Sequence, residues 1–379
     1  MPERDVEGLE DPETPMSGDR PDEFIVALEG GIESADGAER VIYHAIGAGA
    51  TPIDHDGPLR KQGRPACRAG TKRSYDRLPE PRRSAKPLSA QPSNHTGTTP
   101  MSHTVNLENY FTRIGYKGPR AATLEVLQDL HKLHPRSIPF ENLNPLTRRA
   151  VKLDLESVEQ KLITQKRGGY CFEQNALFAN VLTQLGFNVT PLLGRVLWGR
   201  ESGAVPPRTH MVLRVDIKSE AWIADVGFGS VTLTAPLRLI AGTAQLTQLG
   251  TFRLADASHG ALYLEVQSRD ETWARVYRVD LHPVEWIDYE TSNWYTSTAP
   301  DSVFLNNLIV CRVLPESRLT LLNDQLNERA ADGQLISERQ LKTADELATC
   351  LHDQFGLNTG DIDIADVFGR VRSPAAVSA

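Results

Sequence analysis

The spacing of apolar residues changes at Gly186, and this change limits the possible folds more than any other feature of the chain. Before Gly186, apolar side chains recur at intervals of three and four residues, which is the period of an amphipathic helix. After Gly186, they alternate or form short runs between turn residues, which is typical of β-strands. The pattern predicts helices over 107–114, 122–133, from Asp154 onward and from Cys171 to Gly186, and strands over 189–197, 211–217, 222–226, 252–254, 262–267 and 273–279.

The end of the chain has a mixed pattern that begins near Trp286. A strand is expected over 319–322 and a helix over 343–355, which opens with the Thr-x-x-Glu pattern of a capping box. Helices followed by strands and a mixed end predict an α+β fold whose strands form a small barrel or sandwich. The expected regions are helical at 101–186, β at 187–288 and α/β at 289–379.

Residues 1–100 differ from the rest in composition. They contain half of the 24 prolines, and an acidic first half is followed by a basic second half. A stretch of this kind buries too little apolar surface to order itself, so we predict a disordered extension. Two short apolar runs at 24–28 and 41–46 are candidate strands within it.

Composition also excludes several classes of protein. A net charge of −8 over 379 residues argues against a nucleic-acid-binding protein. There is no run of about 18 apolar residues that would span a membrane, and the polar N-terminus does not read as a secretory signal. The four cysteines are too scattered for a disulfide scaffold or a zinc cluster, which predicts a cytoplasmic protein with free thiols.

One of these cysteines, Cys171, has the surroundings of a nucleophile. Two glycines at 168–169 allow a sharp turn, and Cys171 then falls in the first turn of a predicted helix. The helix dipole and the unpaired N–H groups at that end favour a thiolate, which is the reactive form. Cys311 and Cys350 lie in apolar surroundings and are expected in the core.

A nucleophilic cysteine needs a base, and the base needs a group that orients it. His210 begins a predicted strand in which Met211, Leu213 and Val215 share one face, so His210 is expected on the opposite face. Asp225 follows an apolar strand 15 residues later, where a carboxylate needs a partner. This spacing allows two strands and a turn, so Cys171, His210 and Asp225 can form a triad.

Two further histidines, His131 and His134, have i, i+3 spacing on a predicted helix. That spacing could hold a metal ion, but no third ligand lies near them in the sequence. We therefore expect both at the surface and no metal site.

These segments together resemble the arylamine N-acetyltransferase family. The family context Arg-Gly-Gly-x-Cys-x-Glu-x-Asn matches 167–175, its Thr-His-x-x-Leu-x-Val strand matches 209–215, and its Asp-Val-Gly-Phe-Gly segment matches 225–229. The segment at 138–143 matches an Ile-Pro-Phe-Glu-Asn-Leu motif, and residues 293–304 resemble a family loop. The resemblance runs from about Met101 to near the C-terminus.

The resemblance implies a fold with an N-terminal helical bundle, a central β-barrel and a C-terminal α/β lid. It implies a two-step transfer in which acetyl-CoA acetylates Cys171 and an arylamine or hydrazine then takes the acetyl group, without a metal. His210 would move protons, and Asp225 would hold the imidazole and stabilise its charged form. Thr209 and Gly229 would lie beside the triad and approach CoA.

The resemblance also implies an acceptor pocket lined by Phe140, Phe228 and Phe304, whose flat apolar rings suit an aromatic amine. Two departures from the family pattern, Ala299 and Ser230, concern the choice of acceptor more than the acyl-transfer chemistry. The oligomeric state stays open.

Three alternatives remain. Transglutaminases and papain-like proteases also place a cysteine at a helix start beside histidine and aspartate or asparagine, but the segments at 138–143 and 225–229 argue against them. Amide synthases that close macrolactam antibiotics resemble this family and take a carrier-bound polyketide instead of acetyl-CoA. A non-catalytic binding protein of the same fold is disfavoured because all three triad residues are present.

We predict that a chain starting at Met101 folds and retains the activity of the full chain, because the regular periodicity begins there. Circular dichroism, thermal unfolding and an acetyl-transfer assay of both chains check this. Loss of solubility or of activity in the shorter chain would contradict it.

Overall fold

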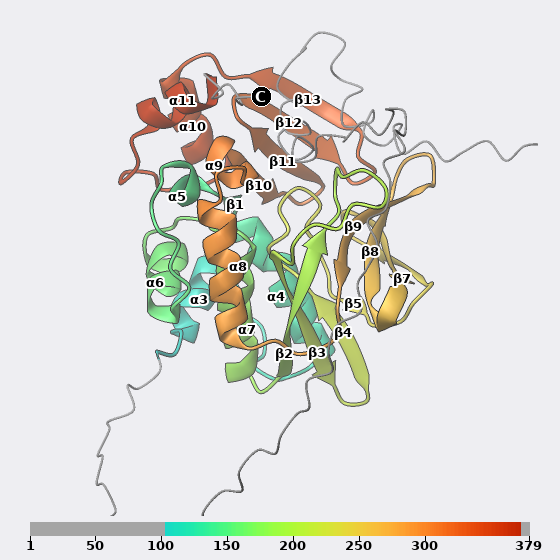
Figure 1. Ribbon diagram of the computed structural model, residues 1–379. Coiled ribbons are helices and arrows are strands. Elements are labelled where there is room, and N and C mark those ends of the chain that lie inside the picture. The colour runs from blue at the N-terminus through green and yellow to red at the C-terminus, as the bar shows by residue number, and fades with distance from the viewer. Residues whose placement is uncertain (1–102, 373–379) are drawn as a thin grey trace, which may run out of the picture. The chain divides into compact units, whose positions relative to one another are not determined.

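The computed structural model describes residues 103–372, in which helices come first and strands follow (Figure 1). The two candidate strands at 24–28 and 41–46, and the extension to which they belong, lie outside the described residues. The first elements are α3 (Leu107–Ile114), α4 (Leu124–Ser137), β1 (Phe140–Glu141), α5 (Leu143–Leu146), α6 (Leu155–Glu159), the π-helical turn η1 (Gln160–Thr164) and α7 (Cys171–Gln184).

The ends of these helices follow local sequence signals. Asp154 caps α6 by accepting a hydrogen bond from the Ser157 backbone N–H at 2.9 Å. Gly115 ends α3 in the left-handed conformation at φ 73°, which glycine adopts without a steric penalty. The predicted starts at Leu107, Asp154 and Cys171 are therefore confirmed.

The second helix departs from the prediction at its end. We expected Pro135 to close a helix over 122–133, but α4 continues to Ser137 with Pro135 inside it. The helix continues because the Ile138 N–H donates to the His134 carbonyl at 2.8 Å, and because Ile138 is fully buried in the core. Proline removes one donor from the helix, and the neighbouring turn and the packing compensate for it.

The expectation that His131 and His134 lie at the surface is wrong, since both side chains have no exposed area. Leu127, Leu130, His131 and His134 follow i, i+3, i+4, i+7 spacing, so the two histidines share the apolar stripe of α4. Both make hydrogen bonds inside the fold. His131 Nε2 accepts the Asp225 backbone N–H at 3.1 Å, and His134 bonds to Tyr110 at 2.9 Å and to Gln174 at 2.7 Å.

An eight-stranded antiparallel sheet follows the helices and curls into a nearly closed barrel. Its strand order is β5-β4-β3-β2-β9-β8-β7-β6. The side-chain amide of Gln245, on edge strand β6, bonds to the backbone N–H and carbonyl of Arg238 on the other edge strand, β5, and so links the two edges. The strands are β2 (Asn188–Val196), β3 (His210–Ile217), β4 (Glu220–Ala224), β5 (Leu237–Arg238), β6 (Ala244–Thr247), β7 (Gly250–Asp256), β8 (Leu262–Gln267) and β9 (Trp273–Val279), with a 3-10 turn η2 (Ser258–Gly260).

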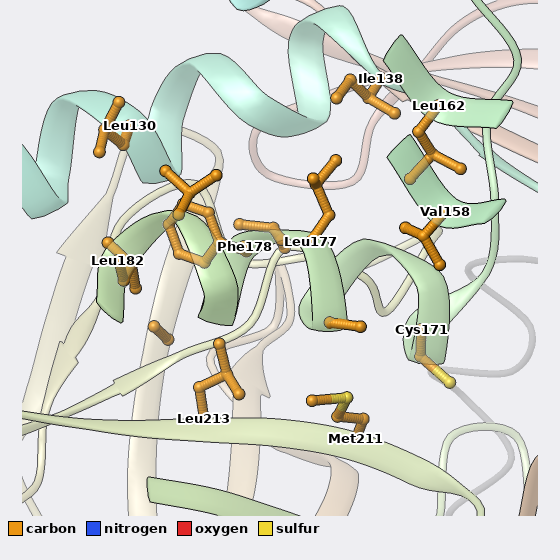
Figure 2. Packing of buried hydrophobic residues seen from close by; sticks show 14 of the residues in the cluster. Leu130, Ile138, Val158, Leu162, Cys171, Leu177, Phe178, Leu182, Met211 and Leu213 are labelled. Atoms are coloured by element: carbon orange, nitrogen blue, oxygen red, sulfur yellow. The ribbon is translucent and has the colours of Figure 1, made fainter. Parts of the chain in front are cut away.

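The sheet has a buried core on each side. Met211 and Leu213 of β3 face α7, where Phe178 lies between α7 and α4 (Figure 2). Val212 points the other way, into the interior of the barrel. The alternation predicted for this strand is therefore confirmed, and it directs His210 toward the barrel interior.

The last part of the chain forms a five-stranded sheet with helices beside it (Figure 1). Its order is β1-β10-β11-β12-β13, so strand β1 from the helical region belongs to it. The segment expected as a loop at 293–304 is instead mostly helical. The elements are α8 (Trp286–Thr298), α9 (Val303–Asn306), β10 (Ile309–Val313), β11 (Ser317–Leu322), β12 (Gln325–Ala330), β13 (Leu335–Gln340), α10 (Ala344–Thr349), the π-helical turn η3 (Cys350–Gln354) and α11 (Ile364–Arg372).

Helix α8 escaped the sequence analysis because its apolar pattern is irregular. Trp294 and Tyr295 are exposed, and the inward positions include the polar Asn293 and Thr296. Asn293 is satisfied inside the fold, because its Nδ2 donates to the Val151 carbonyl at 2.9 Å. Tertiary hydrogen bonds thus hold this helix where apolar periodicity is absent.

We predict that the protein loses stability in mild acid because of its buried histidines. Burial lowers the pKa of His131 to about 4 and that of His134 to about 3. An unfolded histidine has a pKa of about 6.5, so as the pH falls from about 6.5 to 4 only the unfolded chain takes up these protons. The free energy of unfolding should fall by up to about 1.4 kcal/mol per pH unit for each histidine.

Urea unfolding at pH 7, 6 and 5 measures this slope, with His134→Gln as the comparison. Glutamine can keep hydrogen bonds to Tyr110 and Gln174 but does not titrate, so the slope of the variant should be smaller than that of the parent. Equal slopes for the two proteins would contradict the prediction.

Candidate active site

Cys171 is the first residue of α7, at the end of the helix that lies beside strand β3 (Figure 2). Its Sγ donates to the Thr209 carbonyl at 3.6 Å, and the residue is almost fully buried. The preceding N–H, that of Tyr170, donates to Glu173 Oε2 at 3.1 Å, which closes the helix start. The sulfur therefore lies at the positive end of a helix dipole, as expected.

His210 and Asp225 meet at the adjoining ends of two paired strands. His210 is the first residue of β3 and Asp225 follows the last residue of β4, and these strands are neighbours in the sheet. His210 Nε2 donates to Asp225 Oδ2 at 2.7 Å, and both side chains are buried. The pairing predicted from a spacing of 15 residues is present in the structure.

The buried carboxylate of Asp225 has several hydrogen-bond donors. Besides His210, its Oδ1 accepts from Asn175 Nδ2 and from the Gly227 backbone N–H, each at 3.0 Å. Burial by itself raises the pKa of Asp225, but the charge and hydrogen bond of His210 and these donors hold the pKa below its usual value. Asp225 is therefore an anion at neutral pH.

The imidazole of His210 connects Asp225 to Cys171. Burial alone would lower the pKa of His210, but the charge of Asp225, their hydrogen bond and a hydrogen bond with Cys171 raise it above its usual value. Since Nε2 is engaged by Asp225, Nδ1 is the ring nitrogen left for Cys171. Hydrogen bonds thus connect a cysteine to a histidine and that histidine to an aspartate. This arrangement is able to hold a thiolate beside an imidazolium.

Of the two residues expected beside these side chains, Thr209 contacts Cys171 and Gly229 packs against the Phe140 ring. Thr209 supplies the carbonyl that contacts Cys171 Sγ. Gly229 has φ 97°, and a Cβ on it would lie 3.4 Å from the Phe140 ring, so both the backbone conformation and the space favour glycine. The sequence analysis did not predict that Gly227 lies against the site. A Cβ at this position would lie 2.9 Å from Cys171 Cα. The available signal was its position in the Asp-Val-Gly-Phe-Gly segment.

The three aromatic residues expected to line a pocket make ring contacts with other parts of the site. Phe228 stands edge-on to the His210 ring, with centroids 5.1 Å apart. Phe140 and Phe304 come from distant parts of the chain, and their centroids lie 6.0 Å apart. Phe304 also contacts the ring of Tyr170, next to the cysteine, at 5.6 Å. Phe228 therefore lies against His210, while Phe140 and Phe304 lie against each other beside Tyr170.

A buried ionic cluster supports the loop before the cysteine. Arg167 Nη2 bonds to Glu141 at 2.9 Å, and Arg167 Nη1 reaches Asp361 at 3.1 Å. Lys161 pairs with Glu173 at 2.7 Å and lies 3.6 Å from Glu141. The pKa of Glu173 is raised, first by burial and also by Glu141. Arg167 and Glu173 therefore support this loop through their ion pairs.

The sequence analysis did not predict three residues that contact the site. Asn175 donates to Asp225, His131 accepts from the Asp225 backbone, and the Tyr277 ring lies 4.9 Å from that of His210. Asn175 belongs to the motif around Cys171, and that motif was the available signal for it. Tyr277 carried no sequence signal for a place in this site, because it lies in a strand far along the chain from these motifs.

The two remaining cysteines that the structure describes differ from Cys171. Burial raises the pKa of Cys311 to about 12 and that of Cys350 to about 11. Both are core residues, as predicted. Cys67 lies outside the described residues.

Within residues 103–372, no group of three or more histidine, cysteine or acidic side chains is placed to hold a metal ion. None of the helices in that part of the chain is both long enough and apolar enough to cross a membrane.

Comparison with known proteins gives a consistent result. A family model described as N-acetyltransferase matches residues 123–364. The arylamine N-acetyltransferase of Escherichia coli K12 is 41% identical over 256 residues, which cover 67% of this chain and 90% of that protein. The corresponding enzyme of Mycobacterium tuberculosis is 38% identical over 262 residues, covering 68% of this chain and 91% of its own.

Solved structures agree with this. The Mycobacterium marinum arylamine N-acetyltransferase in complex with CoA has a TM-score of 0.68 at 35% identity, over 71% of this chain and 99% of that one. The Salmonella typhimurium enzyme has a TM-score of 0.67 at 38% identity, over 72% of this chain and all of its own. The order of helical bundle, barrel and C-terminal α/β part is therefore that of known structures, and the chain belongs to the arylamine N-acetyltransferase family.

Proposed function

We propose that the protein transfers an acetyl group from acetyl-CoA to the nitrogen of an arylamine or arylhydrazine, by a ping-pong reaction through an acetyl-Cys171 intermediate. The observation that carries this proposal is the hydrogen-bonded connection from Cys171 through His210 to Asp225 at the start of α7. Membership of the family supports the reaction class. The CoA bound to the Mycobacterium marinum relative supports a CoA thioester as donor.

In the first step the Cys171 thiolate attacks the carbonyl carbon of the thioester. The bond from that carbon to the CoA sulfur breaks, and the His210 imidazolium gives its proton to the departing thiolate. Negative charge develops on the carbonyl oxygen, and the backbone N–H of Cys171 is a suitable donor to it, because the first N–H groups of a helix have no acceptor within the helix.

In the second step the amine nitrogen attacks the carbonyl carbon of acetyl-Cys171. The carbon–sulfur bond breaks, His210 takes the proton that the nitrogen loses, and the thiolate–imidazolium pair is restored. Asp225 keeps the imidazole in one tautomer and stabilises its charged form, consistent with its bond to Nε2. Both steps need only groups of this chain and the two substrates.

The acceptor pocket follows from the aromatic cluster. Phe228 lies against His210 and Phe140 lies against Phe304, and these rings would supply apolar walls that suit a flat aromatic ring. Thr209, which contacts Cys171, and Gly229, which packs against Phe140, would approach the CoA end of the donor.

We predict that acetyl-CoA without an amine adds one acetyl group to the parent chain and none to Cys171→Ala. Intact-protein mass spectrometry measures this directly, because the deacylation step has no acceptor and the adduct accumulates. Addition of an arylamine or a hydrazine should remove the adduct. An unmodified parent chain would reject acetyl-CoA as donor and direct attention to carrier-bound polyketides, the donors of the amide-synthase alternative.

We also predict that Phe304→Ala raises the KM for an arylamine by roughly tenfold, which corresponds to the loss of one aromatic contact of about 1.4 kcal/mol. The rate of acetyl adduct formation from acetyl-CoA should change much less. Phe368→Ala, which removes an aromatic ring in the separate core beside α11, is the control and should leave this KM unchanged. Equal effects on both half-reactions would contradict a specific role in acceptor binding.

A further inference from the structure

Helix α4 places one polar side chain against the backbone of Asp225, a member of the Cys171–His210–Asp225 triad. His131 is fully buried, and its Nε2 accepts the backbone N–H of Asp225 at 3.1 Å. This contact joins the helical bundle to the residue whose carboxylate orients His210.

The backbone at Asp225 needs such an acceptor because it has left the sheet. Pairing between β3 and β4 ends at Leu213 and Ala224, so the N–H of the next residue is outside the strand ladder. Three consecutive N–H groups are then held individually. Those of Asp225, Val226 and Gly227 donate to His131 Nε2, to Asn175 Oδ1 and to Asp225 Oδ1.

The ring of His131 is held in one protonation state. Nε2 can accept only when the proton is on Nδ1, and burial lowers the pKa of His131 to about 4, so the ring is neutral at neutral pH. Nδ1 is buried without a hydrogen-bond partner among the residues that the structure describes. A leucine would fill this space without that cost, so filling the core does not account for a histidine here.

We infer that His131 is a positioning residue for Asp225: by accepting the Asp225 N–H it fixes the chain at the end of β4 so that the carboxylate meets His210. The inference rests on the roles proposed above for Cys171, His210 and Asp225. When this bond is lost, Asp225 shifts or rotates, stabilises the His210 imidazolium less, and the thiolate–imidazolium pair forms only at higher pH.

Other titratable groups lie near the Cys171–His210 pair, and their charge must stay the same over the pH range of the test. Tyr277 on β9 lies against His210, and burial raises its pKa well above the usual value. Tyr289 on α8 and Tyr170 before α7 lie near Cys171, and burial also raises their pKa. All three hydroxyls therefore stay neutral across the pH range of the experiment.

The test measures the reactivity of Cys171 itself. Full-length protein is treated with iodoacetamide between pH 5 and 10, and alkylation is followed at the Cys171 peptide by mass spectrometry. His131→Leu should move the midpoint of the rate profile toward alkaline pH by about half a pH unit or more, a change of ~3-fold in the population of the ion pair. His131→Gln keeps an acceptor oxygen and should restore most of the parent profile.

Leu130→Ala is the matched control, since Leu130 is fully buried on the same helix (Figure 2) and its apolar side chain cannot accept the Asp225 N–H. It should lower the melting temperature without moving the midpoint. If His131→Leu does not fold, His131→Phe, which keeps a ring but no acceptor, replaces it in the comparison.

An unchanged midpoint in His131→Leu would overturn the inference. So would equal shifts in His131→Leu and Leu130→Ala, or equal shifts in His131→Leu and His131→Gln, because the hydrogen bond would then not be the cause. Alkylation requires neither acetyl-CoA nor an amine, so the result stands apart from whether the proposed donor and acceptor are right.

Discussion

A buried carboxylate at the end of a strand is the constraint on which the site depends. Asp225 is completely inaccessible, and an unpaired charge there would be far too costly. The fold meets this cost with donors from different elements: His210 from β3, Asn175 from α7 and Gly227 from the following loop. These contacts require the start of α7 and the ends of β3 and β4 to meet, and their meeting places Cys171 beside His210.

A second network of hydrogen bonds and ion pairs supports the loop before Cys171. Strand β1, the edge strand of the C-terminal sheet, joins this loop to that sheet: the Glu141 N–H donates to the Gly169 carbonyl at 3.1 Å, and Phe140 pairs with Cys311 of β10. Glu141 also binds Arg167, which in turn reaches Asp361 near the end of the chain. The C-terminal part is therefore a structural support of the loop before Cys171, and damage to this part should reach Cys171 through β1 and Arg167.

Prediction from sequence succeeded where local physics decides conformation. The starts of α6 and α7, and strands β8 and β9, follow from capping residues and apolar period alone. It failed where contacts distant in sequence override local preference, as in α4 continuing past Pro135 and in the short edge strands β5 and β6. Helix α8 belongs to the same class, because polar Asn293 is stabilised by the carbonyl of Val151 and not by an apolar stripe.

The sequence by itself determined the order of helical, β and mixed regions and pointed to the three side chains for which we propose a role in acyl transfer. Periodicity, caps and motif spacing are local properties, so they are readable without coordinates. Only the tertiary structure decided that His131 is buried and bonded to the Asp225 backbone, because i, i+3 spacing alone does not distinguish a surface pair from a buried one. Burial and the choice of hydrogen-bond partner depend on which elements pack together, and that is a property of the whole fold.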